Sequence, residues 1–405
     1  MSDESGKMRQ RIRILLGVML AISLSLAAKV LIFHPLNTTG VDFDKHYYAA
    51  EAIVNGTSPY TSHGLYLSFN YPQFVAWINL PLLLFKNVDH AEKAWDIGNV
   101  ILLFLTAFLV CKGYKPGTHQ ISGTPEELNL IDSHWWIPGL FLTFFFSPNT
   151  DGIIEGNISQ WTLFSITLAG WAIVRKRDFS IGAWIAIASM IKVMPALLIL
   201  PYITGRRGKV LAGAGIVWGI YLLILLITGT WGNEWFFITR VLPNIGEYWD
   251  HISYSVPYVA LRYGSKRMYQ DPGCLRLASL VWNLIWVISY IVVCLRYREN
   301  IKREKGDMLF LVMGMVLLPV LPPLLEFHHF VWSFPGLLIT YHIFWKGIIP
   351  LRRIYPLFIG FLGLSAVGPF ADVIYINNFS LVAFAPLFGI CIYIFLILAA
   401  REIRD

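Results

Sequence analysis

Two aspartates at the start of the first polar stretch are candidates for acid–base chemistry. Asp42 and Asp44 lie in the run Val-Asp-Phe-Asp-Lys-His-Tyr-Tyr-Ala-Ala, which follows an apolar segment of membrane-span length. A carboxylate at the edge of a bilayer costs free energy unless it is paired or used. Asp42 has no evident backbone role, so we interpret it as a general base, with a solvated loop acid as the alternative. Asp44 is placed to cap a helix that ends at Asn55-Gly56, and this capping role competes with a catalytic one.

A lysine and two histidines in apolar surroundings are candidates for binding an anion. Lys192 lies in Ser-Met-Ile-Lys-Val-Met-Pro, where an ammonium is costly unless it holds a phosphate or a buried carboxylate. Snorkelling of this lysine to the interface is the alternative. His328 and His329 follow a proline-rich turn and are candidates for orienting a phosphate. Adjacent histidines without a third ligand are weak evidence for a metal, so we predict no metal site and no cofactor.

Four tyrosines are candidates for substrate contacts. Tyr47 and Tyr48 follow the two aspartates, and Tyr60 follows a Ser-Pro step. Tyr71 precedes Pro72, which is compatible with the first turn of a short apolar helix. The alternative for Tyr60 and Tyr71 is an interfacial aromatic belt.

A further polar patch, residues 147–157, joins two apolar runs with the sequence Ser-Pro-Asn-Thr-Asp-Gly-Ile-Ile-Glu-Gly-Asn. We interpret it as a tight exterior turn. Glu155 and Asn157 border the next apolar run and would point back toward the bundle, which makes them candidates for binding substrate. An ordinary helix–helix turn is the alternative.

The elements that position these residues are membrane helices. The 405 residues are 56% hydrophobic and only 14% charged, with a mean hydropathy of +0.58, whereas soluble proteins carry about 25% charged residues. This composition excludes an ordinary cytosolic enzyme and a disordered chain. Backbone groups in lipid must be satisfied within the segment, so we predict an all-α polytopic membrane protein with about 10–12 membrane segments. The scattered cysteines (Cys111, Cys274, Cys294 and Cys391) indicate no redox or zinc role.

The apolar runs fall into two groups by length. Shorter runs at 71–86, 135–148 and 179–204 are candidates for spans, half-helices or re-entrant hairpins. Runs of span length lie at 14–33, 96–111, 158–174, 210–229, 276–295, 307–325, 327–345, 353–370 and 378–400.

Basic clusters predict the orientation of the chain. Lysines and arginines gather before the first span, at 175–177 and at 206–209, within a net charge of +7. The positive-inside rule places these clusters in the cytoplasm and segments 34–70 and 230–274 outside. We therefore predict a cell-membrane protein with both termini cytoplasmic, its active site on the exterior face, and a single domain over residues 1–405 without a separate soluble domain.

Taken in order from residue 42 to residue 329, these motifs resemble glycosyltransferase family 87, within the GT-C class of membrane glycosyltransferases. The chain differs from such families at Glu155-Gly156-Asn157, where Gly-Gln-x-Asn or Gly-Gln-Asn is common, and at Tyr71-Pro72-Gln73, where Tyr-Pro-Pro is common. These differences concern the sugar more than the fold. The motifs that carry the resemblance are Asp42-Phe-x-x-x-Tyr-Tyr-Ala-Ala, Gly56-x-x-Pro-Tyr, Tyr71-Pro72, Glu155-Gly156-Asn157, Lys192-x-x-Pro with Arg206-Arg207, and the Pro-rich His-His turn at 322–329.

The resemblance implies a GT-C-type bundle with helices in its exterior loops and a transfer of a hexosyl group, usually mannosyl, from a polyprenyl-phosphate sugar. The acceptor would be a glycolipid or glycan hydroxyl at the lipid bilayer, with no role for nucleic acid. Inverting single displacement needs one base, Asp42 with Asp44 as second candidate, and cations for the leaving phosphate. The implied phosphate-binding residues are Lys192, His328 and His329, with Arg240 or Arg262 as further candidates, and the implied substrate-binding residues are Tyr47, Tyr48, Tyr60, Tyr71, Glu155 and Asn157.

The main rival is a transporter or flippase for a lipid-linked sugar. It would have the same apolar bundle and cations, but internal repeats and polar residues through the depth of the membrane are typical of that class. Here no strong repeat is evident, and the polar candidates gather toward one face, which favours an enzyme. A non-catalytic subunit that binds a glycolipid is the third interpretation.

Overall fold

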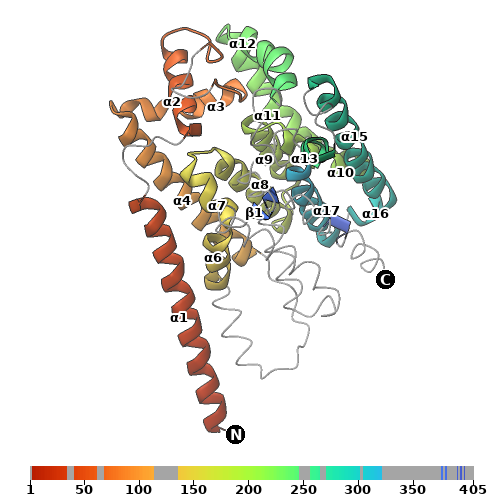
Figure 1. The fold of residues 1–405 in the computed structure, drawn as a ribbon. Coiled ribbons are helices and arrows are strands. Elements are labelled where there is room, and N and C mark those ends of the chain that lie inside the picture. The colour runs from red at the N-terminus through yellow and green to blue at the C-terminus, as the bar shows by residue number, and fades with distance from the viewer. Residues whose placement is uncertain are drawn as a thin grey trace.

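The computed structural model describes residues 2–33, 41–61, 68–113, 136–245, 256–264, 271–301 and 304–321, with short pieces at 375–376, 379–380, 390, 393–394 and 396. Helices dominate these residues (Figure 1), and two strands of two residues each, β1 (Tyr375–Ile376) and β2 (Phe379–Ser380), pair antiparallel. The prediction of an all-α bundle is confirmed for this part of the chain.

The N-terminal helix and the segment after it follow the predicted pattern, with one correction. α1 (Ser2–Phe33) is one continuous helix that contains the predicted span 14–33 and packs on α6 (Figure 1). α2 (Val41–Val54) ends before Asn55-Gly56 as predicted, and Gly56 has φ +69°. However, α2 already includes residues 41–43, so Asp44 lies inside its first turn. The interpretation of Asp44 as N-cap is wrong.

The predicted apolar runs 71–86, 96–111 and 135–148 form helices of differing length. The first gives α3 (Gln73–Ile78) and the 3₁₀ helix η1 (Leu80–Leu84). The second becomes α4 (Val88–Gly113), which starts about two turns earlier than predicted because the Asn87 side chain accepts the amide of Asp89 at 2.7 Å. The third gives α6 (Trp136–Phe145).

The polar patch 147–157 is mostly helical, so its interpretation as a tight turn needs correction. Residues Ser147–Ile154 form α7, and only Glu155 to Ile158 make the turn into α8 (Ser159–Val174). Pro148 lies in the first turn of α7, where its missing amide is not needed. The Asn149 amide donates to the Thr143 carbonyl at 2.7 Å, which ties α7 to the end of α6.

The run 179–204 is broken in two at Lys192. α9 (Asp178–Ile191) ends there, and the 3₁₀ helix η2 (Met194–Ile199) and α10 (Leu200–Thr204) follow. Pro195 in the first turn of η2 cannot donate to a continuing helix, which explains the break. The remaining described helices are α11 (Gly208–Ile227), α12 (Trp231–Phe236), the π-helical η3 (Phe237–Val241), the 3₁₀ helix η4 (Leu242–Asn244), α13 (Val256–Gly264), α15 (Pro272–Arg296), α16 (Arg298–Ile301), α17 (Glu304–Leu317) and the 3₁₀ helix η5 (Leu318–Val320).

Three of the described helices are long and apolar enough to cross a membrane: Val88–Lys112, Gly208–Ile227 and Gly273–Arg296. They contain or overlap the predicted spans at 96–111, 210–229 and 276–295. Large apolar side chains are exposed along them, as lipid-facing surfaces require. The predicted spans at 327–345 and 353–370, and most of 378–400, lie outside the described residues.

An ion-pair cluster ties three helices together. Arg207, at the start of α11, donates to Asp178 of α9 at 2.6 Å and to Asp307 of α17 at 2.9 Å.

Figure 1 shows α2, α3 and α12 together at the end of the bundle that lies away from the N-terminus. The site described below is built at that end.

Close backbone contact joins α9 to α11. A Cβ at Gly182 would lie 1.8 Å from the Val210 carbonyl oxygen, and one at Gly213 would lie 2.0 Å from the Phe179 carbonyl oxygen. Small residues that allow backbones to approach are typical of helix contacts in membranes. These two glycines therefore fix how α9 lies on α11.

We predict that Gly182→Ala destabilises the protein by about 1–3 kcal/mol, because the added methyl overlaps the α11 backbone and forces the helices apart. Thermal unfolding in detergent, followed by size-exclusion chromatography, measures the effect. Gly215→Ala is the matched control on α11, since a Cβ there meets nothing within 4 Å. Equal melting temperatures for the two variants would contradict the prediction.

Candidate functional site

The first turns of α2 place an acidic and a basic side chain on one buried face. Asp42 is 6% exposed and Lys45, three residues later, is 3% exposed. Residues three apart are neighbours on a helix surface, and the Lys45 ammonium pairs with Oδ1 of Asp42. The sequence placed Asp42 here, but it gave Lys45 no role.

The turn between α7 and α8 is pressed against the start of α2. The Asp42 amide donates to the Glu155 carbonyl at 3.0 Å, and the Trp95 indole donates to the Gly156 carbonyl at 3.0 Å. Gly156 has φ +66°, and a Cβ on it would lie 2.5 Å from Cβ of Phe43. Only glycine fits both the conformation and the space. This turn therefore sets the position of the next residue, Asn157.

The side-chain amide of Asn157 connects Asp42 on α2 to Lys192, which directly follows α9. Its Nδ2 donates to Oδ2 of Asp42 and lies 3.4 Å from the Tyr71 hydroxyl oxygen. Its Oδ1 accepts from the Ser159 amide at 2.9 Å and from the Lys192 ammonium at 3.1 Å. Asn157 is 1% exposed, so these bonds form away from solvent.

Lys192 points into the site. Its Nζ donates to Oδ1 of Asn157 and, at 2.9 Å, to Oγ of Ser159, and the residue is 7% exposed. This geometry contradicts the snorkelling alternative. The break between α9 and η2 turns the side chain inward, because Lys192 itself has an extended backbone (φ −139°, ψ 132°).

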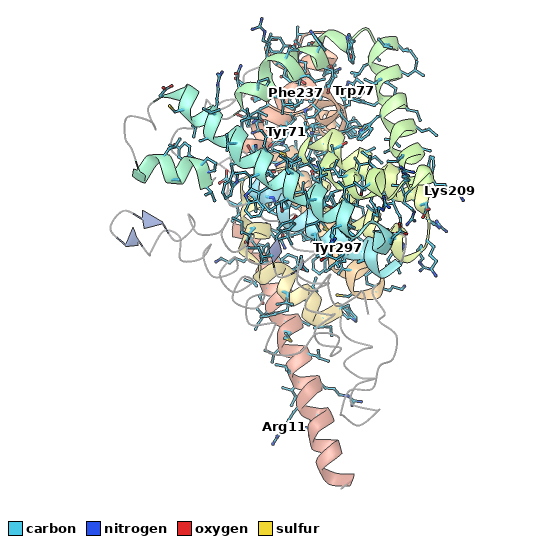
Figure 2. All side chains as sticks on the ribbon, turned by 90° about the vertical axis from the view of Figure 1, so that its right-hand side faces the viewer. Arg11, Tyr71, Trp77, Lys209, Phe237 and Tyr297 are labelled. Atoms are coloured by element: carbon cyan, nitrogen blue, oxygen red, sulfur yellow. The ribbon has the colours of Figure 1, made fainter. Side chains whose placement is uncertain are left out.

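Both lysines approach the Tyr71 ring. The Lys45 Nζ is 5.0 Å and the Lys192 Nζ is 5.5 Å from its centroid, within the range of cation–π contact. Figure 2 shows Tyr71 at the same end of the molecule as Trp77 and Phe237, far from Arg11 on α1. Lys45 and Lys192 thus meet at one aromatic ring, and Lys45 also pairs with Asp42; the formal charges of these three described side chains sum to +1.

His46 packs on the same ring. Its imidazole centroid is 4.8 Å from that of Tyr71, the residue is 0% exposed, and within the described residues neither ring nitrogen has a hydrogen-bond partner. Burial, and then the nearby Lys45 charge, lower the pKa of His46 to about 3. His46 therefore stays neutral at physiological pH. It is four residues from Asp42, a helical spacing that could have identified it from sequence.

The structure brings together four of the predicted site residues: Asp42, Tyr71, Asn157 and Lys192. Asp44 is fully buried. It follows Asp42 by two residues on α2, so its side chain lies on a different face of the helix. Glu155 contributes its carbonyl group to Asp42. His328, His329 and the side chain of Arg262 lie outside the described residues, and Arg240 is exposed on η3.

The other predicted tyrosines make structural contacts. The Tyr47 hydroxyl donates to the Phe85 carbonyl at 3.1 Å, and the Tyr48 ring lies edge-on to Tyr47 with centroids 5.7 Å apart. The Tyr60 hydroxyl donates to the Tyr71 carbonyl at 2.9 Å. Of these three, Tyr60 binds Tyr71 directly, through its backbone carbonyl. No group of three or more metal-ligating side chains occurs in the part of the chain that the structure describes.

Comparison with known families and curated proteins gives two matches. The family model described as Glycosyltransferase family 87 matches residues 69–323, more than half of the chain. Among curated proteins, the chain is similar to the polyprenol-phosphate-mannose-dependent alpha-(1-2)-phosphatidylinositol mannoside mannosyltransferase of Mycobacterium tuberculosis. The two are 21% identical over 326 residues, which cover 76% of this chain and 71% of that protein.

Among solved structures, the chain is similar to ArnT from Cupriavidus metallidurans bound to undecaprenyl phosphate. The TM-score is 0.42 at 11% identity, with 95% of this chain and 76% of that chain covered. The apo state of ArnT gives a TM-score of 0.41 at 11% identity, with coverage of 94% and 76%.

We predict that His46 makes folding stability fall with acid. Its pKa rises from about 3 in the folded protein to the ordinary value of 6.5 on unfolding, so the unfolded chain binds more protons between these values and stability decreases as pH drops below 6.5. At pH 5 this difference in pKa lowers the free energy of unfolding by about 2 kcal/mol, since one pKa unit corresponds to about 1.4 kcal/mol.

Melting temperatures at pH 7.5 and pH 5 measure this effect. The His46→Gln variant should lose less stability between the two pH values than the unmodified protein. His90→Gln, which changes an exposed histidine, is the control and should keep the full pH dependence. The same pH dependence in both variants would contradict the assignment.

Proposed function

The chain belongs to glycosyltransferase family 87, and from this membership we propose that it transfers a sugar from a polyprenyl-phosphate donor to an acceptor hydroxyl at the membrane. The observation that carries the proposal is the bridge from Asp42 through the Asn157 amide to Lys192, beside the Tyr71 ring. In this arrangement the Asp42 carboxylate can act as general base on the acceptor hydroxyl, and the Lys192 ammonium can bind the leaving phosphate.

Asp42 is the proposed general base. Asn157 binds one of its oxygens and Lys45 the other, and a carboxylate has about four lone-pair sites, so these two bonds do not prevent it from accepting a proton. The acceptor oxygen would form a bond to the anomeric carbon as its proton moves to Asp42. The bond from that carbon to the phosphate oxygen would break, with the electron pair leaving on the polyprenyl phosphate. One displacement of this kind inverts the anomeric configuration.

Lys192 and Lys45 are the proposed partners of the donor phosphate. Their ammonium groups approach the same ring, and the formal charges of these two groups and Asp42 sum to +1, which favours an anion at this place. Charge-assisted bonds from ammonium to phosphate oxygen would stabilise the charge that develops on the leaving group. His328 and His329 remain candidates for the same phosphate, and the proposal requires no metal.

The proposal extends to the donor sugar, the acceptor and the orientation of the protein in the membrane. The donor sugar is a hexose, most simply mannose, as in the name of the mycobacterial relative, and the acceptor is a glycolipid or glycan. The protein acts as a single membrane domain, with both termini in the cytoplasm and the site facing the exterior. This orientation is supported by the basic clusters at 175–177 and 206–209.

We predict that Asp42→Asn lowers turnover at least about a hundredfold, the usual scale for loss of a general base, while the protein still folds and inserts into the membrane. Transfer from radiolabelled polyprenyl-phosphate sugars to membrane lipid extracts measures turnover. Glu51→Gln, at an exposed acid of the same helix, is the control. If Asp42→Asn stays active and Asp44→Asn does not, the base is Asp44.

We predict that Lys192→Ala weakens donor binding, because it removes an ammonium from a site with a net charge of +1. Loss of a hydrogen bond to a charged group costs about 1.5–3 kcal/mol, which corresponds to about 10–150-fold in the donor KM. Lys209→Ala, at an exposed lysine (Figure 2), is the matched control. A reduced yield of folded protein with an unchanged donor KM would show that Lys192 is only structural.

The decisive assay uses purified protein in nanodiscs with a panel of polyprenyl-phosphate sugars, with and without EDTA. Transfer or slow hydrolysis of one donor that is insensitive to EDTA and absent in Asp42→Asn would establish the proposed reaction. Movement of these lipids across liposomes without turnover of any donor would instead identify a flippase.

A further inference from the structure

A buried acid on α12 binds the start of α3. Glu234 is 6% exposed, although its neighbours Trp235 and Phe236 are 55% and 46% exposed. Its Oε2 accepts from the Tyr221 hydroxyl at 2.8 Å and from the Gln73 backbone amide at 3.1 Å. Burial of a carboxylate is costly unless such bonds are made. Glu234 is therefore placed for this contact.

Together, Glu234 and Tyr221 cap a helix from which they are distant in sequence. The first amides of any helix lack partners within it, and the residue before α3, Pro72, provides no side-chain cap. Glu234 accepts from Gln73, and the Tyr221 hydroxyl oxygen accepts from the Phe74 amide at 3.3 Å. The start of α3 thus depends on residues of α11 and α12.

The contact is reciprocal. With its amide oriented so that both atoms are satisfied, the Gln73 side chain donates to the Thr230 carbonyl at 3.2 Å and accepts from the Thr230 hydroxyl at 2.9 Å. Thr230 directly precedes α12. The two short helices therefore hold each other at their N-terminal ends.

This contact reaches the site through Tyr71, which lies two residues before Gln73. A second route leads to the same residue: the Tyr60 ring stacks on Phe237 with centroids 6.0 Å apart, and its hydroxyl donates to the Tyr71 carbonyl. Tyr71 is thus fixed from both sides by the segment that contains Glu234. Figure 2 shows Tyr71 and Phe237 near each other.

We propose that Glu234 is a positioning residue: by capping α3 it holds the Tyr71 ring within cation–π distance of Lys45 and Lys192, and so sets the place where the donor phosphate binds. This inference rests on the proposed function. Glu234 acts through Tyr71 and does not touch the reacting atoms.

The test compares Glu234→Ala with Glu234→Gln, which keeps an oxygen to accept from Tyr221 and Gln73. We expect Glu234→Ala to raise the donor KM about tenfold or more, the scale for loss of a hydrogen bond to a charged group, with the acceptor KM unchanged. Glu234→Gln should stay within about threefold of the unmodified protein. Glu299→Ala, at an exposed acid of α16, is the control. A lower kcat with an unchanged donor KM would overturn the inference.

Equilibrium binding of undecaprenyl phosphate to the purified protein in nanodiscs separates the inference from the function. Binding to the unmodified protein that is weakened in Glu234→Ala and kept in Glu234→Gln supports the inference. Equal binding to all three overturns it and leaves the proposed function standing. Absence of binding and of turnover in the unmodified protein overturns both. If Glu234→Ala does not fold, Tyr221→Phe replaces it, and unchanged binding in that variant overturns the inference.

Discussion

The site depends on one side-chain amide. Asn157 donates to the carboxylate of Asp42 and accepts from the ammonium of Lys192, and a neutral amide can do both at once through its separate NH₂ and oxygen. A carboxylate or a lysine at this position would satisfy one partner and repel the other. The surrounding structure serves this amide: Gly156 permits the turn, Trp95 binds the turn, and α2 brings the acid.

The charges of the site belong to elements that the chain brings together from far apart. Asp42 and Lys45 are on α2, whereas Lys192 follows α9, and no described backbone bond connects these two segments directly. Both ammonium groups approach the Tyr71 ring, which offers them an electron-rich face. The ring therefore helps two cations that would otherwise repel each other to share a buried site, in which Asp42 already supplies one carboxylate.

The sequence predicted the site residues whose types are costly in apolar surroundings. Asp42, Asn157 and Lys192 stand out because polar groups at a membrane edge need a reason. Lys45 did not stand out, since it resembles an ordinary residue of a surface helix until that helix is buried. The start of α2 was mispredicted because it depends on a bond from Asp42 to Glu155, which no local pattern encodes.

The close backbone contact of α9 with α11 at Gly182 and Gly213 has a consequence for the position of the site in the bilayer. Backbone against backbone, α9 cannot slide along α11 without losing this fit, and Lys192 follows Gly182 by ten residues, about 15 Å along a helix. The glycine contact thus sets the depth of the ammonium relative to a span. In a thicker or thinner bilayer, such helices adjust by tilting, and α9 and α11 would tilt as one body. The site would keep its geometry while its height above the lipid changed.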